Sequence, residues 1–138
     1  MKGRNMLNKF ATSLIFALGL TIVDAPGLTL LHAAEMMVNG GKMVGVSGHQ
    51  AGGTVAIVKD GDVTKLVLKA DFNLQAAPDA KLGFGKDGYI KGTIFSKLKK
   101  IAGAQEYVIP ASVDLSKYNE VWVWCEKFNV PLGMAKLN

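Results

Sequence analysis

The chain has 138 residues, of which 49% are hydrophobic and 20% charged, a composition that suits one globular domain and excludes an intrinsically disordered chain. It carries 16 Lys and Arg against 11 Asp and Glu, giving a formal net charge of +5 at pH 7. Its single cysteine excludes an internal disulfide, a zinc site built from several cysteines and a c-type haem attachment, because each of these needs more thiols.

The N-terminal residues have the order of a secretory signal peptide. Lys2, Arg4 and Lys9 precede an apolar run over residues 10–23. That run has about 14 residues, whereas a helix needs roughly 20 apolar residues to cross a membrane. We therefore predict a signal peptide, typical of a bacterial exported protein.

Cleavage is expected after Ala34, or after Ala33, which divides the chain into a signal peptide over 1–34 and a domain over 35–138. The mature protein would then be periplasmic or secreted, with no stable membrane span. An uncleaved anchor that uses both apolar runs of this region is the alternative.

From Gly40 onward, short alternating runs bounded by Gly, Asp, Asn and Pro predict an all-β domain. Asp60-Gly61 predicts a tight hairpin turn between two of these runs. One short helical turn is expected around residues 95–101. The predicted strands cover residues 43–47, 54–58, 64–72, 81–85, 92–96, 105–109, 120–128 and 131–137.

About seven or eight short strands in a region of this length favour a single β-sandwich-like domain or a partly closed barrel, because one open sheet would leave too much apolar surface uncovered. No internal repeat or linker divides the region.

Gly83, Gly85 and Gly88 match the dinucleotide fingerprint G-x-G-x-x-G. That motif requires a strand before it and a helix after it, and the surrounding pattern is all-β, so we interpret it as a turn. Lys97, Lys99 and Lys100 form the densest basic stretch. We interpret these lysines as a solvated face, and no nucleic-acid partner is predicted.

Candidate catalytic groups are few. His49 is the one histidine of the predicted mature domain, and it lies in a glycine-rich stretch typical of a loop. It is either a solvated loop residue or a helper to Cys125, should the fold bring the two together. No metal site is predicted, since the histidine, cysteine and carboxylates show no ligand spacing. An enzymatic activity is not favoured.

Residues 120–128 are the most distinctive stretch. Alternation places Val121, Val123 and Cys125 on one face and Trp122, Trp124 and Phe128 on the other, which predicts a central strand with two apolar faces. The aromatic face is either a packing layer or a ligand platform. Cys125 is by default a small buried hydrophobic residue, with Lys127 as the nearest cation on its face.

A series of spaced residues runs through nearly the whole predicted domain. These residues are Gly41, His49, Gly53, Thr54, Val55, Leu66, Leu68, Phe72, Pro78, Asp79, Gly103, Gln105, Tyr107, Ile109, Pro110, Val113, Asp114, Leu115, Tyr118, Val121, Val123, Trp124, Cys125, Phe128, Gly133, Ala135 and Leu137. In this order they resemble the DM-thirteen domain family, the electron-transfer DM domain. The C-terminal series, which ends in Trp-Cys-x-x-Phe, is the most specific part. The chain departs from the family pattern at Met43 and Leu132, where aromatic residues are usual, and over 81–85.

The resemblance implies a β-sandwich-like domain with a redox or electron-transfer role centred on Cys125, as a bare thiol or as a ligand to a prosthetic group such as haem. His49 is the candidate helper or second ligand, because an imidazolium stabilises a thiolate and an imidazole can ligate a metal. The expected partner is a redox partner or another extracytoplasmic protein. The competing hypothesis is a non-enzymatic binding or adhesion module in which Cys125 only fills the core.

Overall fold

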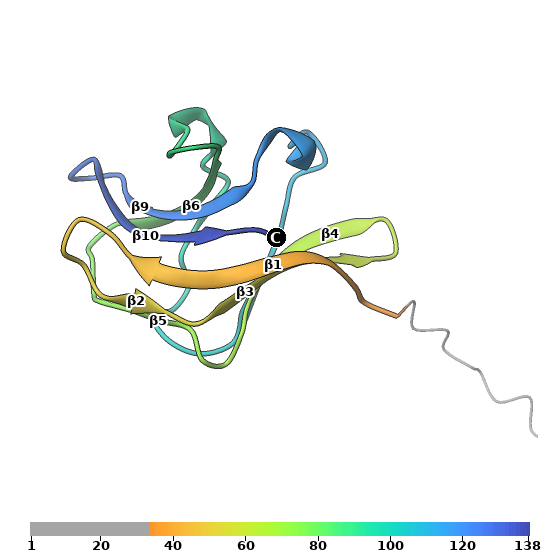
Figure 1. Ribbon diagram of the computed structural model, residues 1–138, viewed down its shortest axis with the longest axis horizontal. Coiled ribbons are helices and arrows are strands. Elements are labelled where there is room, and N and C mark those ends of the chain that lie inside the picture. The colour runs from red at the N-terminus through yellow and green to blue at the C-terminus, as the bar shows by residue number, and fades with distance from the viewer. Residues whose placement is uncertain (1–33) are drawn as a thin grey trace, which may run out of the picture. The chain divides into compact units, whose positions relative to one another are not determined.

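Ten β-strands and two short 3₁₀ helices make up the described part of the chain, residues 34–138 of the computed structural model (Figure 1). In chain order these are β1 (Met36–Gly45), β2 (Ala51–Gly52), β3 (Thr54–Asp60), β4 (Val63–Leu68), β5 (Asn73–Leu74), β6 (Ala80–Gly85), η1 (Lys91–Thr93), β7 (Ser96–Lys97), β8 (Gln105–Val108), η2 (Leu115–Lys117), β9 (Glu120–Cys125) and β10 (Val130–Lys136). The predicted signal peptide lies outside the described residues, except for Ala34. No helix within residues 34–138 is long and apolar enough to span a membrane.

Eight of the strands form one sheet in the order β7-β6-β9-β10-β1-β3-β4-β8, and every neighbouring pair is antiparallel. The sheet curls into a nearly closed barrel, and β2 and β5 form a separate two-stranded sheet. The all-β prediction, with its partly closed barrel, is therefore confirmed.

The β3–β4 hairpin follows from its turn chemistry and its alternation. Asp60 pairs with Val63, so the two turn residues are Gly61 and Asp62, one position later than the predicted Asp-Gly pair. Gly61 has a φ of +60°, which a residue without a Cβ adopts at little cost. Leu66 and Leu68 then point into the barrel, where both are fully buried.

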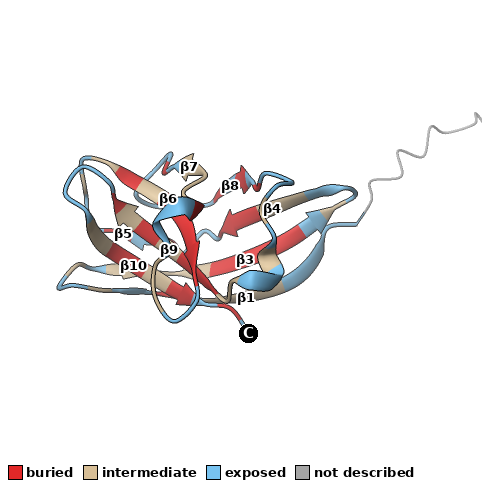
Figure 2. Ribbon diagram, turned by 90° about the horizontal axis from the view of Figure 1, so that it is seen from above, coloured by how far each residue is buried: buried red, intermediate tan, exposed pale blue. Residues whose placement is uncertain are grey.

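The core lies inside the barrel. Its buried side chains come from every strand of the large sheet except β7, and buried segments are seen along the strands in Figure 2. The largest of them are Phe72, Phe84, Ile57, Leu66, Leu68, Leu82 and Leu132.

The strand predicted over residues 120–128 is shorter than expected. β9 ends at Cys125, and a turn follows in which Asn129 has a φ of +53° and donates its N–H to the Glu126 carbonyl (3.3 Å). Alternation no longer applies beyond Cys125. Phe128 is therefore 61% exposed and does not join the Trp face, and Lys127 is exposed in the turn, with its Nζ 5.6 Å from the Phe128 ring.

Two further predictions over residues 91–101 are wrong. A 3₁₀ helix, η1, replaces the first part of the predicted strand over 92–96, and the expected helical turn at 95–101 contains the edge strand β7 instead. The cause is a buried side chain: the Thr93 hydroxyl accepts the Phe84 N–H (2.7 Å) and has the carbonyls of Phe84 and Ile90 within 2.8 and 2.6 Å. These contacts fold the segment back on β6.

β7 and β8 are the two end strands of the large sheet and form a seam. No ladder pairing joins them within the described residues, but side chains bridge the seam near the loop that connects them. The Tyr107 hydroxyl accepts the Lys99 N–H (2.8 Å) and donates to Gln105 Oε1, which also accepts the Lys100 N–H (3.1 Å). Side-chain hydrogen bonds from β8 to the backbone of the connecting loop therefore hold this end of the seam.

Candidate functional site

Cys125 is the last residue of β9 and points into the barrel. It is 1% exposed, and its Cα partners are Ala80 in β6 and Val130 in β10. Val121 and Val123 share its face and are fully buried, as the alternation predicted. The thiol is thus enclosed by apolar side chains in a central strand.

Trp122 and Trp124 lie on the outer face of β9 and are half-buried. Tyr89, from the loop after β6, covers this face: its ring stacks on Trp124 with the centroids 3.9 Å apart and the planes 11° apart, and it meets Trp122 edge-on at 6.3 Å. The three rings form what we call the aromatic cluster. Because Tyr89 occupies the face of Trp124, the cluster is a packing layer rather than an open platform for a ligand ring.

A buried carboxylate holds the cluster in place. Glu120 accepts hydrogen bonds at Oε2 from the Trp122 indole N–H (2.9 Å) and the Gly88 N–H (3.0 Å), although the residue is only 6% exposed. It thereby ties the loop that carries Tyr89 to β9. The Tyr89 hydroxyl is buried and has no hydrogen-bond partner among residues 34–138. Burial, with the nearby Glu126 charge, raises the pKa of Tyr89.

Charged residues flank the cluster in a compact group. Lys81, whose Cα partner is Trp124, forms ion pairs with Glu126 (2.9 Å) and Asp79 (3.5 Å). The hydrogen bond to Glu126 raises the pKa of Lys81, so this lysine stays charged at neutral pH. The group orders the β9–β10 turn next to Cys125.

The glycine motif serves this loop and not a nucleotide. Gly83 and Gly85 lie in β6, and within the described residues no α-helix follows Gly88. A Cβ on Gly85 would come within 2.1 Å of the Gly88 carbonyl oxygen and 2.5 Å of the Trp122 Nε1. Glycine is therefore required where the loop folds back over β9.

His49 lies in the loop after β1, at the same end of the barrel as Cys125, where this loop and the β9–β10 turn come to the same side in Figure 1. The Val46 N–H donates to the Leu132 carbonyl (3.2 Å), and the His49 N–H donates to the Val46 carbonyl (3.0 Å). Within residues 34–138 no hydrogen bond joins the His49 ring to Cys125. The structure brings His49 to the correct end, and its role as helper stays a prediction.

The packing around Cys125 does not fit a haem. A flat macrocycle needs an open cleft beside its ligand, whereas Cys125 is enclosed, and the four cavities described in this domain are lined by other residues. Within residues 34–138 no group of three or more His, Cys, Asp or Glu side chains is placed to hold a metal ion.

The sequence did not predict two residues of this site, Tyr89 and Glu120. The loop after β6 brings Tyr89 back to β9, and Glu120, the first residue of β9, accepts the Gly88 N–H of that loop. Neither relation has a local sequence signal. The glycine spacing at 83–88 was the one hint, because it marked a tight loop before Tyr89.

Comparison with known proteins gives the family of the chain. The chain matches no curated protein and no solved structure. A family model described as "Electron transfer DM13" matches residues 43–137, a span that includes His49, Trp124 and Cys125. Because the match covers more than half of the chain, this protein belongs to the electron-transfer DM13 family.

Proposed function

We propose that this protein is an exported electron-transfer module in which Cys125 is the redox-active side chain, present as a bare thiol, and in which the aromatic cluster faces the redox partner. Cys125 and Trp124 are consecutive residues of β9 with side chains on opposite faces. This is the observation that carries the proposal, since only the backbone of one strand separates the enclosed sulfur from the Tyr89–Trp124 stack.

The burial of Cys125 favours electron transfer across β9 over thiol–disulfide exchange. Exchange requires direct attack on sulfur, and it depends on access of the second thiol. A sulfur that is 1% exposed, in a chain without a second cysteine, does not meet that requirement in the folded state. One electron would instead pass from the Cys125 thiol across β9 to an oxidised partner protein. The S–H bond would break, its proton would be released to water, and a thiyl radical would remain on the Cys125 sulfur.

A one-electron oxidant, hexachloroiridate, tests this proposal when it is added to the native protein near neutral pH. We expect the thiol titrated after denaturation to fall from one per chain, while iodoacetamide added to native protein leaves it unchanged. The Cys125→Ala variant should consume less oxidant. An absorbance scan of protein from its native host should show only the aromatic band.

The competing function is a binding module in which Cys125 only fills the core, and the enclosure of Cys125 among valines favours it. It predicts that the oxidant leaves one thiol per chain, and that result would overturn the redox proposal. Visible absorption that disappears in Cys125→Ala would instead contradict the bare thiol. His49→Ala tests the helper role and should slow thiol oxidation if the imidazole assists.

Export is proposed from the basic residues Lys2, Arg4 and Lys9 and the apolar run after them. Mass spectrometry of the protein from a cell envelope or culture fraction should find an N-terminus near Glu35. Intact Met1 in a cytosolic fraction would contradict export.

A further inference from the structure

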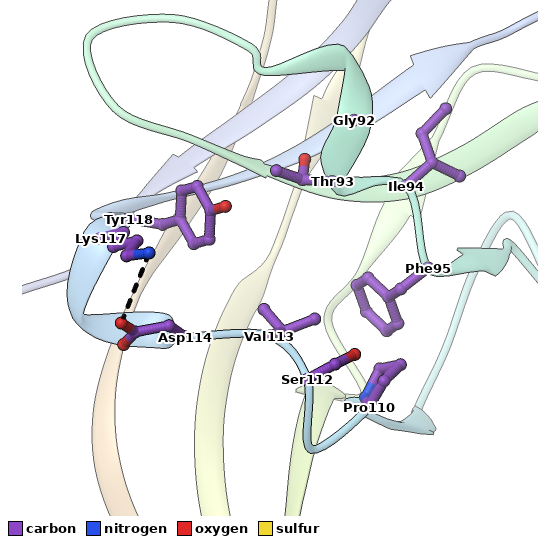
Figure 3. A pocket seen from close by; sticks show the side chains of 10 residues that line it. All are labelled: Gly92, Thr93, Ile94, Phe95, Pro110, Ser112, Val113, Asp114, Lys117 and Tyr118. Atoms are coloured by element: carbon purple, nitrogen blue, oxygen red, sulfur yellow. Dashed lines mark ion pairs between the residues drawn. The ribbon is translucent and has the colours of Figure 1, made fainter.

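The seam between β7 and β8 opens at the end away from their connecting loop. There the chain before β7 and the chain after β8 part and leave a cavity of about 470 Å³ (Figure 3). It is lined by Gly92, Thr93, Ile94, Phe95, Pro110, Ser112, Val113, Asp114, Lys117 and Tyr118. We call this the seam cavity.

Aromatic rings form two sides of the seam cavity. In Figure 3 the rings of Phe95 and Tyr118 approach it from opposite sides. Both stack on Phe84, with centroid distances of 5.2 Å and 5.7 Å and interplanar angles of 12° and 19°. Phe84 is fully buried, so both rings rest on a fixed support. The apolar sides of the cavity are therefore preformed and suit a flat ring.

The polar groups of the seam cavity are mostly donors. The hydroxyls of Ser112 and Tyr118 make no hydrogen bond within residues 34–138. The Asp114 carboxylate is already engaged, because its Oδ1 accepts the Ser116 N–H (3.1 Å) and hydroxyl (2.6 Å), and these bonds lower the pKa of Asp114. Lys117 is 69% exposed, and its Nζ forms a long ion pair with Asp114 Oδ2 (3.9 Å). An ammonium has three N–H donors, so Lys117 keeps donors that Asp114 does not use.

We propose that the seam cavity binds a small aromatic carboxylate, with the ring between Phe95 and Tyr118 and the carboxylate toward Lys117 and the free hydroxyls. A flat ring matches the two aromatic sides, and a carboxylate supplies the acceptor oxygens that these donors lack. The site is separate from Cys125, because Phe84 pairs with Val121, four residues or about 13 Å along β9 from the thiol.

Titration of the purified protein with benzoate, followed by amide NMR near neutral pH, tests this inference. We expect saturable shifts confined to residues 92–95 and 110–118, with a dissociation constant on the order of 1 mM. Lys117→Gln should weaken benzoate binding about fivefold, since a partly exposed charge pair contributes up to about 1 kcal/mol. Lys69→Gln, an exposed lysine without an ion pair within the described residues, is the matched control and should change nothing.

Two ligand analogues test the ring and the charge separately. Cyclohexanecarboxylate keeps the charge and loses the flat ring, and benzyl alcohol keeps the ring and loses the charge; each should bind about fivefold more weakly than benzoate. Benzyl alcohol should also lose its sensitivity to Lys117→Gln. Absence of saturation below about 20 mM, or equal binding of all three ligands, would overturn the inference. Cys125→Ala should bind benzoate like the wild type, whatever the outcome of the redox test.

Discussion

Single side chains with several hydrogen bonds hold the irregular segments of this domain. Gln105, which is 7% exposed, accepts the Lys100 N–H and donates to the carbonyls of Lys100 (2.9 Å) and Gly103 (3.2 Å), so the β7–β8 loop closes on one amide group. Lys65 acts similarly at the surface, with Asp60, Glu35 and Glu106 within 3.6 Å of its Nζ. Its hydrogen bond to Asp60 raises the pKa of Lys65 well above the usual range.

The hydrogen bonds that Asp71 accepts make part of the stability of the domain depend on pH. Its carboxylate accepts the Thr54 N–H and the Thr54 hydroxyl, both at 2.8 Å, and these bonds lower the pKa of Asp71 below the ordinary 3.8. The bonds therefore stabilise the fold fully above that ordinary value, and the stabilisation is lost as the pH falls through the lowered pKa.

We accordingly expect Asp71→Ala to be less stable than the wild type near neutral pH, with a difference in the free energy of unfolding that shrinks as the pH is lowered below about 4. Urea unfolding at several pH values measures it. Asp62→Ala, at a turn carboxylate without hydrogen bond or ion pair within residues 34–138, is the control. A difference that stayed constant across this range would show that the carboxylate charge plays no part.

At the scale of elements, β9 organises the domain because both of its faces are packed. Its inner face fills the barrel with Val121, Val123 and Cys125, and its outer face carries the aromatic cluster. Glu120 at the start of the strand ties down the loop that brings Tyr89.

The Tyr89–Trp124 stack should be measurable as a coupling energy. Trp124→Ala is expected to cost about 2–3 kcal/mol, below the range for fully buried tryptophans because the ring is half-buried. In a double-mutant cycle with Tyr89→Ala, we expect a coupling of about 0.5–1.5 kcal/mol, obtained from urea unfolding. Phe128→Ala, at an exposed ring, should cost less than about 0.5 kcal/mol. A coupling near zero would mean that the two rings do not stack in solution.

At the scale of the whole domain, closure of the barrel depends on the seam. Ladder hydrogen bonds join every neighbouring pair of strands from β7 to β8 along the large sheet, but no ladder joins β7 to β8 within the described residues. β7 has only two residues and β8 only four, and the side chains of Tyr107 and Gln105 bind β8 to the loop after β7 instead. One end of the seam is closed in this way, and the other end leaves the seam cavity.

Removal of the Tyr107 hydroxyl should therefore weaken the whole barrel. Tyr107→Phe leaves the Lys99 N–H without its acceptor and is expected to cost about 1–3 kcal/mol in the free energy of unfolding. Faster hydrogen exchange at the Lys99 amide should accompany the loss. Tyr118→Phe, whose hydroxyl makes no hydrogen bond within the described residues, should stay within about 0.5 kcal/mol of the wild type. Equal effects of the two substitutions would argue against a closing role for Tyr107.

The sequence by itself determined the all-β class, the β3–β4 hairpin, the inward and outward faces of β9 and the family. These features depend on period-two alternation, on turn residues and on a specific residue order, all of which are local in the chain. Alternation placed Cys125 on the same face as Val121 and Val123 and made burial its default, and the structure buries that face.

Only the tertiary structure decided where strands end and what meets across them. β2, β5 and β7 have two residues each, too short for a periodic signal, and they exist because distant segments pair with them. Phe128 does not lie on the Trp face, because β9 ends before it. The ring that packs on that face is Tyr89, from the loop after β6. The seam cavity likewise depends on two edges that curvature brings together, and curvature of a sheet arises from all of its strands at once rather than from any one stretch of residues.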